Sequence, residues 1–109
     1  MSSEKIRLAT WGGRSVFEYT GSVTSGTRLH FGEDFKWEVM VPGDIYSRLL
    51  REFAGRVVPA GTSKTDPPEG SLGAWLMENL TRQALSSYVA AILVHENYAK
   101  KDQQMIAFR

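Results

Sequence analysis

The sequence predicts an α+β protein with an N-terminal antiparallel sheet of about four strands, followed by three helices and a C-terminal strand. Two observations support this prediction. Apolar and polar residues alternate with a period of two through the first 41 residues, and from residue 42 onward they follow the 3.6-residue spacing of helices. No internal repeat or linker divides the chain. We therefore expect residues 1–109 to form a single domain, with 1–41 mainly strands and 42–109 mainly helices around a long loop at 56–70.

Short links separate the strand segments. The alternating segments are 5–11, 14–20, 27–31 and 35–41. Gly12 and Gly13 predict a two-residue turn between the first two, because glycine readily adopts a positive φ. Consecutive strands with such short connections favour an antiparallel meander.

The first helix is predicted over 45–54. Pro42 and Gly43 end the preceding strand, Asp44 is a candidate N-cap, and Gly55 closes the helix. The pair Val57-Val58 that follows is a candidate edge strand.

Two more helices are predicted after the long loop. Ser71 is a candidate cap for the second helix, and Thr81 for a third that runs to about Tyr98. Only Arg82 and Glu96 are charged in that third helix, which indicates a helix central in its domain or in a subunit interface. The last strand, 104–109, is expected to return to the N-terminal sheet.

These patterns also predict which residues form the core. Alternation alone does not decide which face of each strand points inward, and a shift of one residue would exchange each strand residue for its neighbour. The predicted members are Leu8, Val16, Phe17, Leu29, Phe31, Trp37, Val39, Ile45, Leu49, Phe53, Trp75, Leu76, Leu85, Val89, Ile92 and Ile106.

Composition excludes several classes of protein. The chain has 13 Lys and Arg against 12 Asp and Glu, so no strong overall field attracts it to nucleic acid or lipid, and such binding needs a local patch. With 0 cysteines there are no disulfides, thiolate nucleophiles or cysteine-bound metals. The longest apolar stretch, 88–94, is too short for a membrane span, and no signal peptide is recognised. We expect a cytoplasmic protein with no membrane partner.

Catalytic patterns are sparse. The 2 histidines form no ligand pair, no Gly-x-Ser-x-Gly elbow is present, and we expect no catalytic residue, metal or cofactor. One enzyme class stays open: Glu18 with Asp34 and Lys36 matches the acidic residues and lysine of metal-dependent nucleases. A solvated strand edge is the simpler interpretation of these residues.

The loop at 61–65 is a candidate anion site. Its small and hydroxyl-bearing residues free backbone N–H groups close to the start of the second helix, which favours phosphate. The alternative is a surface loop with local side-chain caps. The candidate ligands are Thr62, Ser63, Lys64 and Thr65.

A winged-helix-like C-terminal half would place the N-terminal end of the third helix against base edges. The third helix begins with polar residues and continues with apolar ones, although it carries few cations. The candidate base contacts are Arg82, Gln83, Ser86 and Ser87, and the candidate phosphate contacts are Arg48, Arg51, Arg56 and Lys64.

These patterns favour a small non-enzymatic module that binds nucleic acid in a regulatory role. The alternative is a protein-interaction adaptor or inhibitor acting as a homo-oligomer, suggested by 3 tryptophans, 4 tyrosines and a small-residue side on the third helix. That side contains Ser86, Ser87, Ala90 and Val94, which would allow a second helix to approach closely. A metal-dependent nuclease ranks third.

Overall fold

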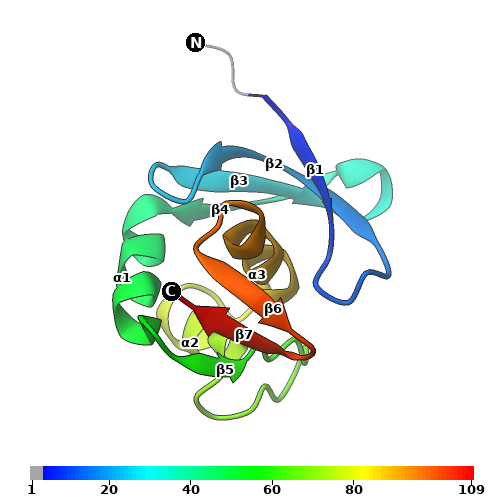
Figure 1. The fold of residues 1–109 in the computed structure, drawn as a ribbon. Coiled ribbons are helices and arrows are strands. Elements are labelled where there is room, and N and C mark those ends of the chain that lie inside the picture. The colour runs from blue at the N-terminus through cyan, green and yellow to red at the C-terminus, as the bar shows by residue number, and fades with distance from the viewer. Residues whose placement is uncertain (1–3) are drawn as a thin grey trace.

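The computed structural model describes residues 4–109 and begins with a four-stranded antiparallel sheet (Figure 1). The strand order in space is the order in the chain, so the predicted meander is confirmed. A short 3-10 turn, η1 (Glu33–Phe35), precedes the last strand. The strands are β1 (Ile6–Ala9), β2 (Val16–Ser22), β3 (Gly26–Phe31) and β4 (Trp37–Pro42).

The rest of the chain forms three helices and a second, three-stranded antiparallel sheet. The strand order in this sheet is β5-β7-β6, so the final hairpin pairs with the short strand that follows the first helix. The elements are α1 (Gly43–Phe53), β5 (Val57–Pro59), α2 (Leu72–Asn79), α3 (Ser86–His95), β6 (Ala99–Asp102) and β7 (Met105–Phe108).

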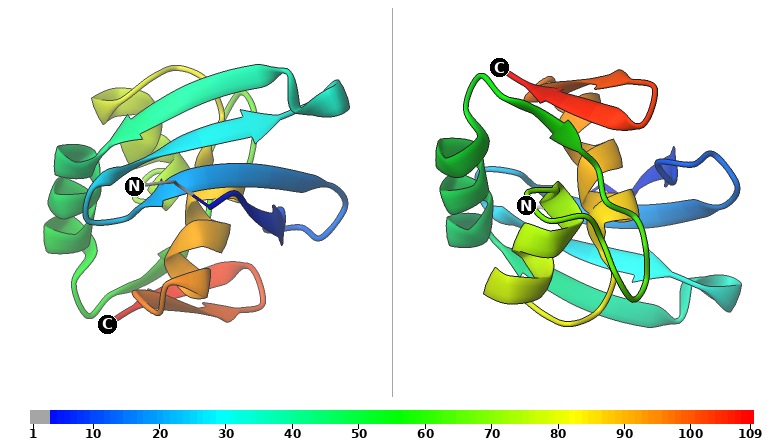
Figure 2. Two further views of the ribbon diagram at one scale, coloured as in Figure 1. Left: turned by 90° about the horizontal axis from the view of Figure 1, so that it is seen from above. Right: turned by 90° about the horizontal axis from the view of Figure 1, so that it is seen from below.

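Helix α3 lies between the two sheets, and α1 lies beside them (Figure 2). On the side of the first sheet, the ring of Tyr88 is 5.1 Å from that of Phe17 and 4.7 Å from that of Phe31. On the other sides of α3, Val89 and Ile92 are fully buried, whereas Ala91 and Val94 are half-buried. This position explains why α3 has so few charges, because only His95 among its residues is exposed and the others are buried or half-buried.

The link between β1 and β2 is longer than predicted. The last paired residues are Ala9 and Val16, so the connection spans residues 10–15 instead of Gly12 and Gly13 alone. The Trp11 side chain is buried in the core, and its backbone N–H donates to the Ser87 carbonyl at 2.9 Å. The chain needs the extra residues to return from that contact.

Most of the predicted core is buried, with two errors. Val16 is 49% exposed because its neighbour Phe17 takes the inward side of β2, and alternation allows only one of the two. Trp37 is 60% exposed because it lies over Gly32 at the end of the sheet. Leu8, Phe31, Val39 and Trp75 are half-buried, and the fully buried members are Phe17, Leu29, Ile45, Leu49, Phe53, Leu76, Leu85, Val89, Ile92 and Ile106.

The helix boundaries differ in part from those predicted. The Ser71 cap is confirmed, since its hydroxyl accepts the N–H of Ala74 at 3.1 Å. Asp44 lies in the first turn of α1 and its side chain makes no cap hydrogen bond. The predicted start of the third helix at Thr81 is wrong. Both Leu80 and Thr81 donate their N–H groups to the Leu76 carbonyl, which ends α2, and residues 80–85 form a loop before α3.

The strand predicted at the C-terminus is confirmed, but its predicted partner is wrong. β7 pairs with β5 and β6, not with the N-terminal meander. Residues 99–102, which follow the third helix predicted to run to about Tyr98, form β6. The edge strand predicted at residues 57–58 is β5. Within residues 4–109, no helix has the length and apolar character needed to cross a membrane.

Candidate functional site

The residues predicted to contact bases do not share one exposed helix end. Ser86 is 1% exposed, and its hydroxyl donates to the Gly61 carbonyl at 2.8 Å. The carbonyl of Ser87 accepts the Trp11 N–H, so the first turn of α3 faces the interior. Arg82 and Gln83 are exposed in the preceding loop.

The 61–65 loop shows local capping at its centre. The Ser63 hydroxyl accepts the N–H groups of Thr65 at 3.4 Å and Asp66 at 3.0 Å. The side chains of Thr62 and Lys64 are exposed. Gly61 is packed instead, because a Cβ there would lie 2.3 Å from the Ser71 hydroxyl. The loop is therefore an ordered connection with an exposed tip.

Two of the predicted phosphate contacts lie in one shallow cleft of about 340 Å³, which also includes Glu52, Trp75 and Asn79. Arg48 donates to the Asn79 side-chain oxygen at 2.8 Å, and its guanidinium carbon is 5.6 Å from the centre of the Trp75 ring. Arg51 is exposed one turn further along α1, and it makes no ion pair or side-chain hydrogen bond within residues 4–109. This cleft combines an unpaired guanidinium with an oriented one and an indole ring.

Arg56 lies elsewhere, in a larger cleft of about 510 Å³ that shares Glu52 and Trp75 with the first. Its guanidinium is 3.4 Å from the Glu52 carboxylate and 5.4 Å from the centre of the Phe53 ring. The cleft contains four carboxylates, which repel phosphate. These carboxylates belong to Glu52, Asp66, Glu69 and Glu78.

The three residues of the nuclease hypothesis have different surroundings. The carboxylate of Glu18 is paired with Arg7 at 2.8 Å on the outer face of the first sheet. Asp34 is exposed in η1, and Lys36 follows it. Residues 4–109 contain no group of three or more histidine or acidic side chains that could hold a metal ion.

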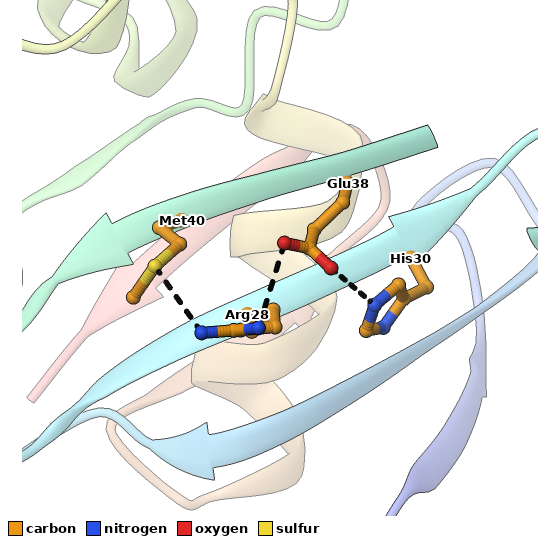
Figure 3. A network of polar contacts seen from close by, with 4 residues as sticks. All are labelled: Arg28, His30, Glu38 and Met40. Atoms are coloured by element: carbon orange, nitrogen blue, oxygen red, sulfur yellow. Dashed lines mark hydrogen bonds and ion pairs between the residues drawn. The ribbon is translucent and has the colours of Figure 1, made fainter. Parts of the chain in front are cut away.

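A polar network on the outer face of the first sheet was not predicted (Figure 3). The Glu38 carboxylate is 3.5 Å from the Arg28 guanidinium and 3.0 Å from His30 Nε2. His30 Nδ1 is buried without a hydrogen-bond partner within residues 4–109. His30 lies opposite Glu38 in the β3–β4 register. Finding this pair from sequence requires the correct turn between the strands, in which Phe31 pairs with Trp37.

A second feature that sequence reasoning missed is an apolar groove of about 300 Å³ between β1 and α3. The residues that line it are Leu8, Ala9, Thr10, Trp11, Ala91, Val94, His95 and Lys101. The contact between these segments depends on tertiary packing, and no local pattern indicates it.

Comparison with known proteins adds no functional information, since no protein family, no curated protein and no solved structure matches this chain.

Proposed function

We propose that the chain is a small non-enzymatic module that binds nucleic acid, with Arg48 and Arg51 contacting phosphates and Trp75 stacking on a base. The observation that carries this proposal is the cleft that brings these three side chains together with Asn79. Guanidinium groups bind phosphate through paired hydrogen bonds, and aromatic rings stack on bases of any sequence. Arg82 adds a third exposed cation just after the C-terminal end of α2.

The order of elements in the C-terminal half supports a winged-helix-like interpretation. Helix α1 leads to β5, then to the helix pair α2 and α3, and the β6–β7 hairpin pairs with β5. In helix-turn-helix modules the second helix of the pair enters the major groove. Here the first sheet covers α3, so we assign the phosphate contacts to α1 and the end of α2 instead.

This assignment predicts weak binding that depends on salt. Three phosphate contacts on a single strand correspond to a slope of about −2 in a plot of log K against log salt. Asp66, Glu69 and Glu78 in the adjacent cleft restrict the anionic ligand to the Arg48 and Arg51 side of Trp75. Glu52 lines both clefts, and its carboxylate is paired with Arg56 at 3.4 Å.

The test is fluorescence anisotropy with labelled DNA and RNA strands of roughly 12 nucleotides, at about 50 mM and about 200 mM salt. We expect Arg51→Glu to weaken binding about tenfold, or about 1.4 kcal/mol, and to reduce the salt slope. Arg51 has no partner within residues 4–109, so the variant should fold normally.

Lys100→Glu is the matched control, because Lys100 is an exposed cation on β6 and the charge change is the same. Equal losses for the two variants, or no binding of either strand at about 50 mM salt, would show that the cleft is not a nucleic-acid site.

Within residues 4–109, β1 pairs with β2 alone, and this open edge favours a second candidate function, contact with a protein partner. The homodimer predicted through the small-residue side of the third helix has little surface available, since Ser86 is 1% exposed and Ala90 is 0% exposed. Of that side, the half-buried Val94 lies in the groove beside β1.

A further inference from the structure

The outer side of β1 has backbone groups without partners. Thr10 donates its N–H to the Ser15 carbonyl at 2.9 Å, which makes this a hydrogen-bonded pair of the β1–β2 ladder. Hydrogen-bonded pairs alternate in an antiparallel ladder, so Leu8 and Phe17 form the next one. The N–H and C=O groups of Arg7 and Ala9 therefore point away from β2. No other strand pairs with β1, and no hydrogen bond outside the ladder reaches these two backbones within residues 4–109.

The edge is closed at one end. The backbone N–H and C=O groups of Trp11 also point away from β2, but both have partners. The N–H donates to the Ser87 carbonyl, and the C=O accepts a hydrogen bond from Lys101 Nζ. The open part of the edge consequently covers Arg7 to Ala9, and it stops at Trp11.

The apolar groove lies directly beside this open edge. Its surface comes from Leu8 and Trp11 on one side and from Ala91 and Val94 of α3 on the other. Side chains of neighbouring strands project to the same face of a sheet. A strand added to β1 would therefore direct alternate side chains over α3 and into the groove.

The charged residues around the β1 edge indicate which kind of partner would bind there. Lys5 lies next to the edge and Lys101 lines the groove, whereas Arg7 is paired with Glu18 and Glu4 is a further carboxylate beside the strand. A second copy paired through β1 would offer this edge no carboxylate from its own strand, because Ile6–Ala9 contains no acidic residue. The Lys101 ammonium has three donors and uses one on the Trp11 carbonyl, so two are free for a carboxylate.

We propose that the edge of β1 accepts an extended acidic segment of a partner protein as a fifth strand. Its backbone pairs with Arg7 and Ala9, one apolar side chain fills the groove, and a carboxylate meets Lys101. Addition of a strand to an exposed edge is a general mode of peptide recognition, in which the backbone supplies affinity and alternate side chains supply specificity. This surface is separate from the Arg48 and Arg51 cleft.

The test is an NMR titration of the ¹⁵N-labelled protein with a synthetic peptide of roughly eight residues that alternates valine and glutamate. We expect saturable shifts of the Arg7 and Ala9 amides with a dissociation constant of about 1 mM or tighter. The same peptide with lysine in place of glutamate should bind at least about tenfold more weakly. Equal binding of the two peptides, or no shifts at millimolar concentration, would overturn the proposal.

Three variants test the parts of the site. Ala9→Pro removes the free N–H but leaves the β1–β2 ladder intact, so it should abolish binding in a folded protein. Val94→Glu should block the groove, and Lys101→Gln should reduce the preference for the acidic peptide. Val57→Glu on the exposed edge of β5 is the control and should bind normally.

The two proposals can fail separately. Arg51→Glu should leave peptide binding unchanged, and Val94→Glu should leave nucleic-acid binding unchanged. Peptide-induced shifts confined to the β4 or β5 edge would contradict the assignment to β1. Shifts of Arg7 and Ala9 that grow with protein concentration alone would identify a second copy as the occupant and overturn the acidic partner.

Discussion

At the scale of single residues, Glu96 connects distant parts of the chain. It follows α3 directly, and its two carboxylate oxygens accept the Tyr19 hydroxyl at 2.7 Å and the Val23 N–H at 3.0 Å. These bonds hold the end of β2 against α3. A carboxylate that accepts two hydrogen bonds in a partly buried site contributes more than an exposed ion pair does.

We predict that Glu96→Gln lowers the free energy of unfolding by about 1–3 kcal/mol, because the amide has a single acceptor oxygen for two donors. Urea denaturation measures the change. Glu69→Gln is the control, since Glu69 is exposed, and its effect should stay within about 0.5 kcal/mol. Equal midpoints for the two variants would mean that the bonds to Tyr19 and Val23 contribute nothing.

Local contacts of single residues could be predicted from sequence, whereas distant ones could not. The cap formed by Ser71 depends on an N–H three residues away, and the residue type alone suggests it. The bond between Tyr19 and Glu96 spans 77 residues, and nothing near either residue marks it. Arg48 and Arg51 were predicted as phosphate contacts from their charge, but their position beside Trp75 depends on the packing of α1 against α2.

At the scale of elements, the loop before α2 is fixed by close backbone contact. The N–H of Gly73 donates to the Ala60 carbonyl at 3.0 Å, and a Cβ at Gly73 would lie 1.9 Å from the Gly61 carbonyl oxygen. That same oxygen accepts the buried Ser86 hydroxyl. Gly73 thus lets the loop, α2 and α3 meet at one point.

We predict that Gly73→Ala destabilises the protein by about 3 kcal/mol or more, although alanine is about 1 kcal/mol better than glycine inside an ordinary helix. The methyl group would push the loop away from α2 and break the Ser86 bond. Thermal unfolding measures the loss. Gly12→Ala meets open space and a permissive φ, so it should leave the midpoint nearly unchanged. An unchanged Gly73→Ala midpoint would show that the loop shifts without cost.

The misplaced start of the third helix has a physical reason at this scale. Residues 74–98 contain no glycine or proline, so beyond the candidate cap at Thr81 the local sequence offers no signal for a loop at residues 80–85. The break arises because Leu85 is buried in the core and Ser86 bonds to the preceding loop. The partner of the C-terminal strand was missed for a similar reason. Its pairing with β5 requires α2 and α3 to be placed first, and the strand pattern itself suits either sheet.

At the scale of the whole molecule, tyrosines lie where the layers meet. Burial raises the pKa of Tyr46, whose hydroxyl is hydrogen-bonded to Thr27 at 2.8 Å between α1 and the first sheet. Burial is also the main cause of the raised pKa of Tyr19, and the hydrogen bond to Glu96 and its negative charge add to it. Tyr88 packs between Phe17 and Phe31 with its pKa raised by burial. Assembly of the layers therefore depends on three neutral phenols.

The molecule should lose stability in alkali for this reason. In the unfolded chain these tyrosines ionise near pH 10, whereas the folded protein keeps them protonated. Above about pH 10 the unfolded state binds fewer protons than the folded state, so the free energy of unfolding falls as pH rises, by up to about 1.4 kcal/mol per pH unit for each tyrosine that stays protonated in the folded protein. Below the unfolded pKa the three residues add no pH dependence.

Urea midpoints between about pH 8 and about pH 11, followed together with phenolate absorbance, test the expectation. Tyr46→Phe should reduce the slope by up to about 1.4 kcal/mol per pH unit, since it removes one group that stays protonated in the folded state. Full titration of all tyrosines near pH 10 in a protein that stays folded would contradict it, because the phenols would then have to lie in contact with water and not between the layers.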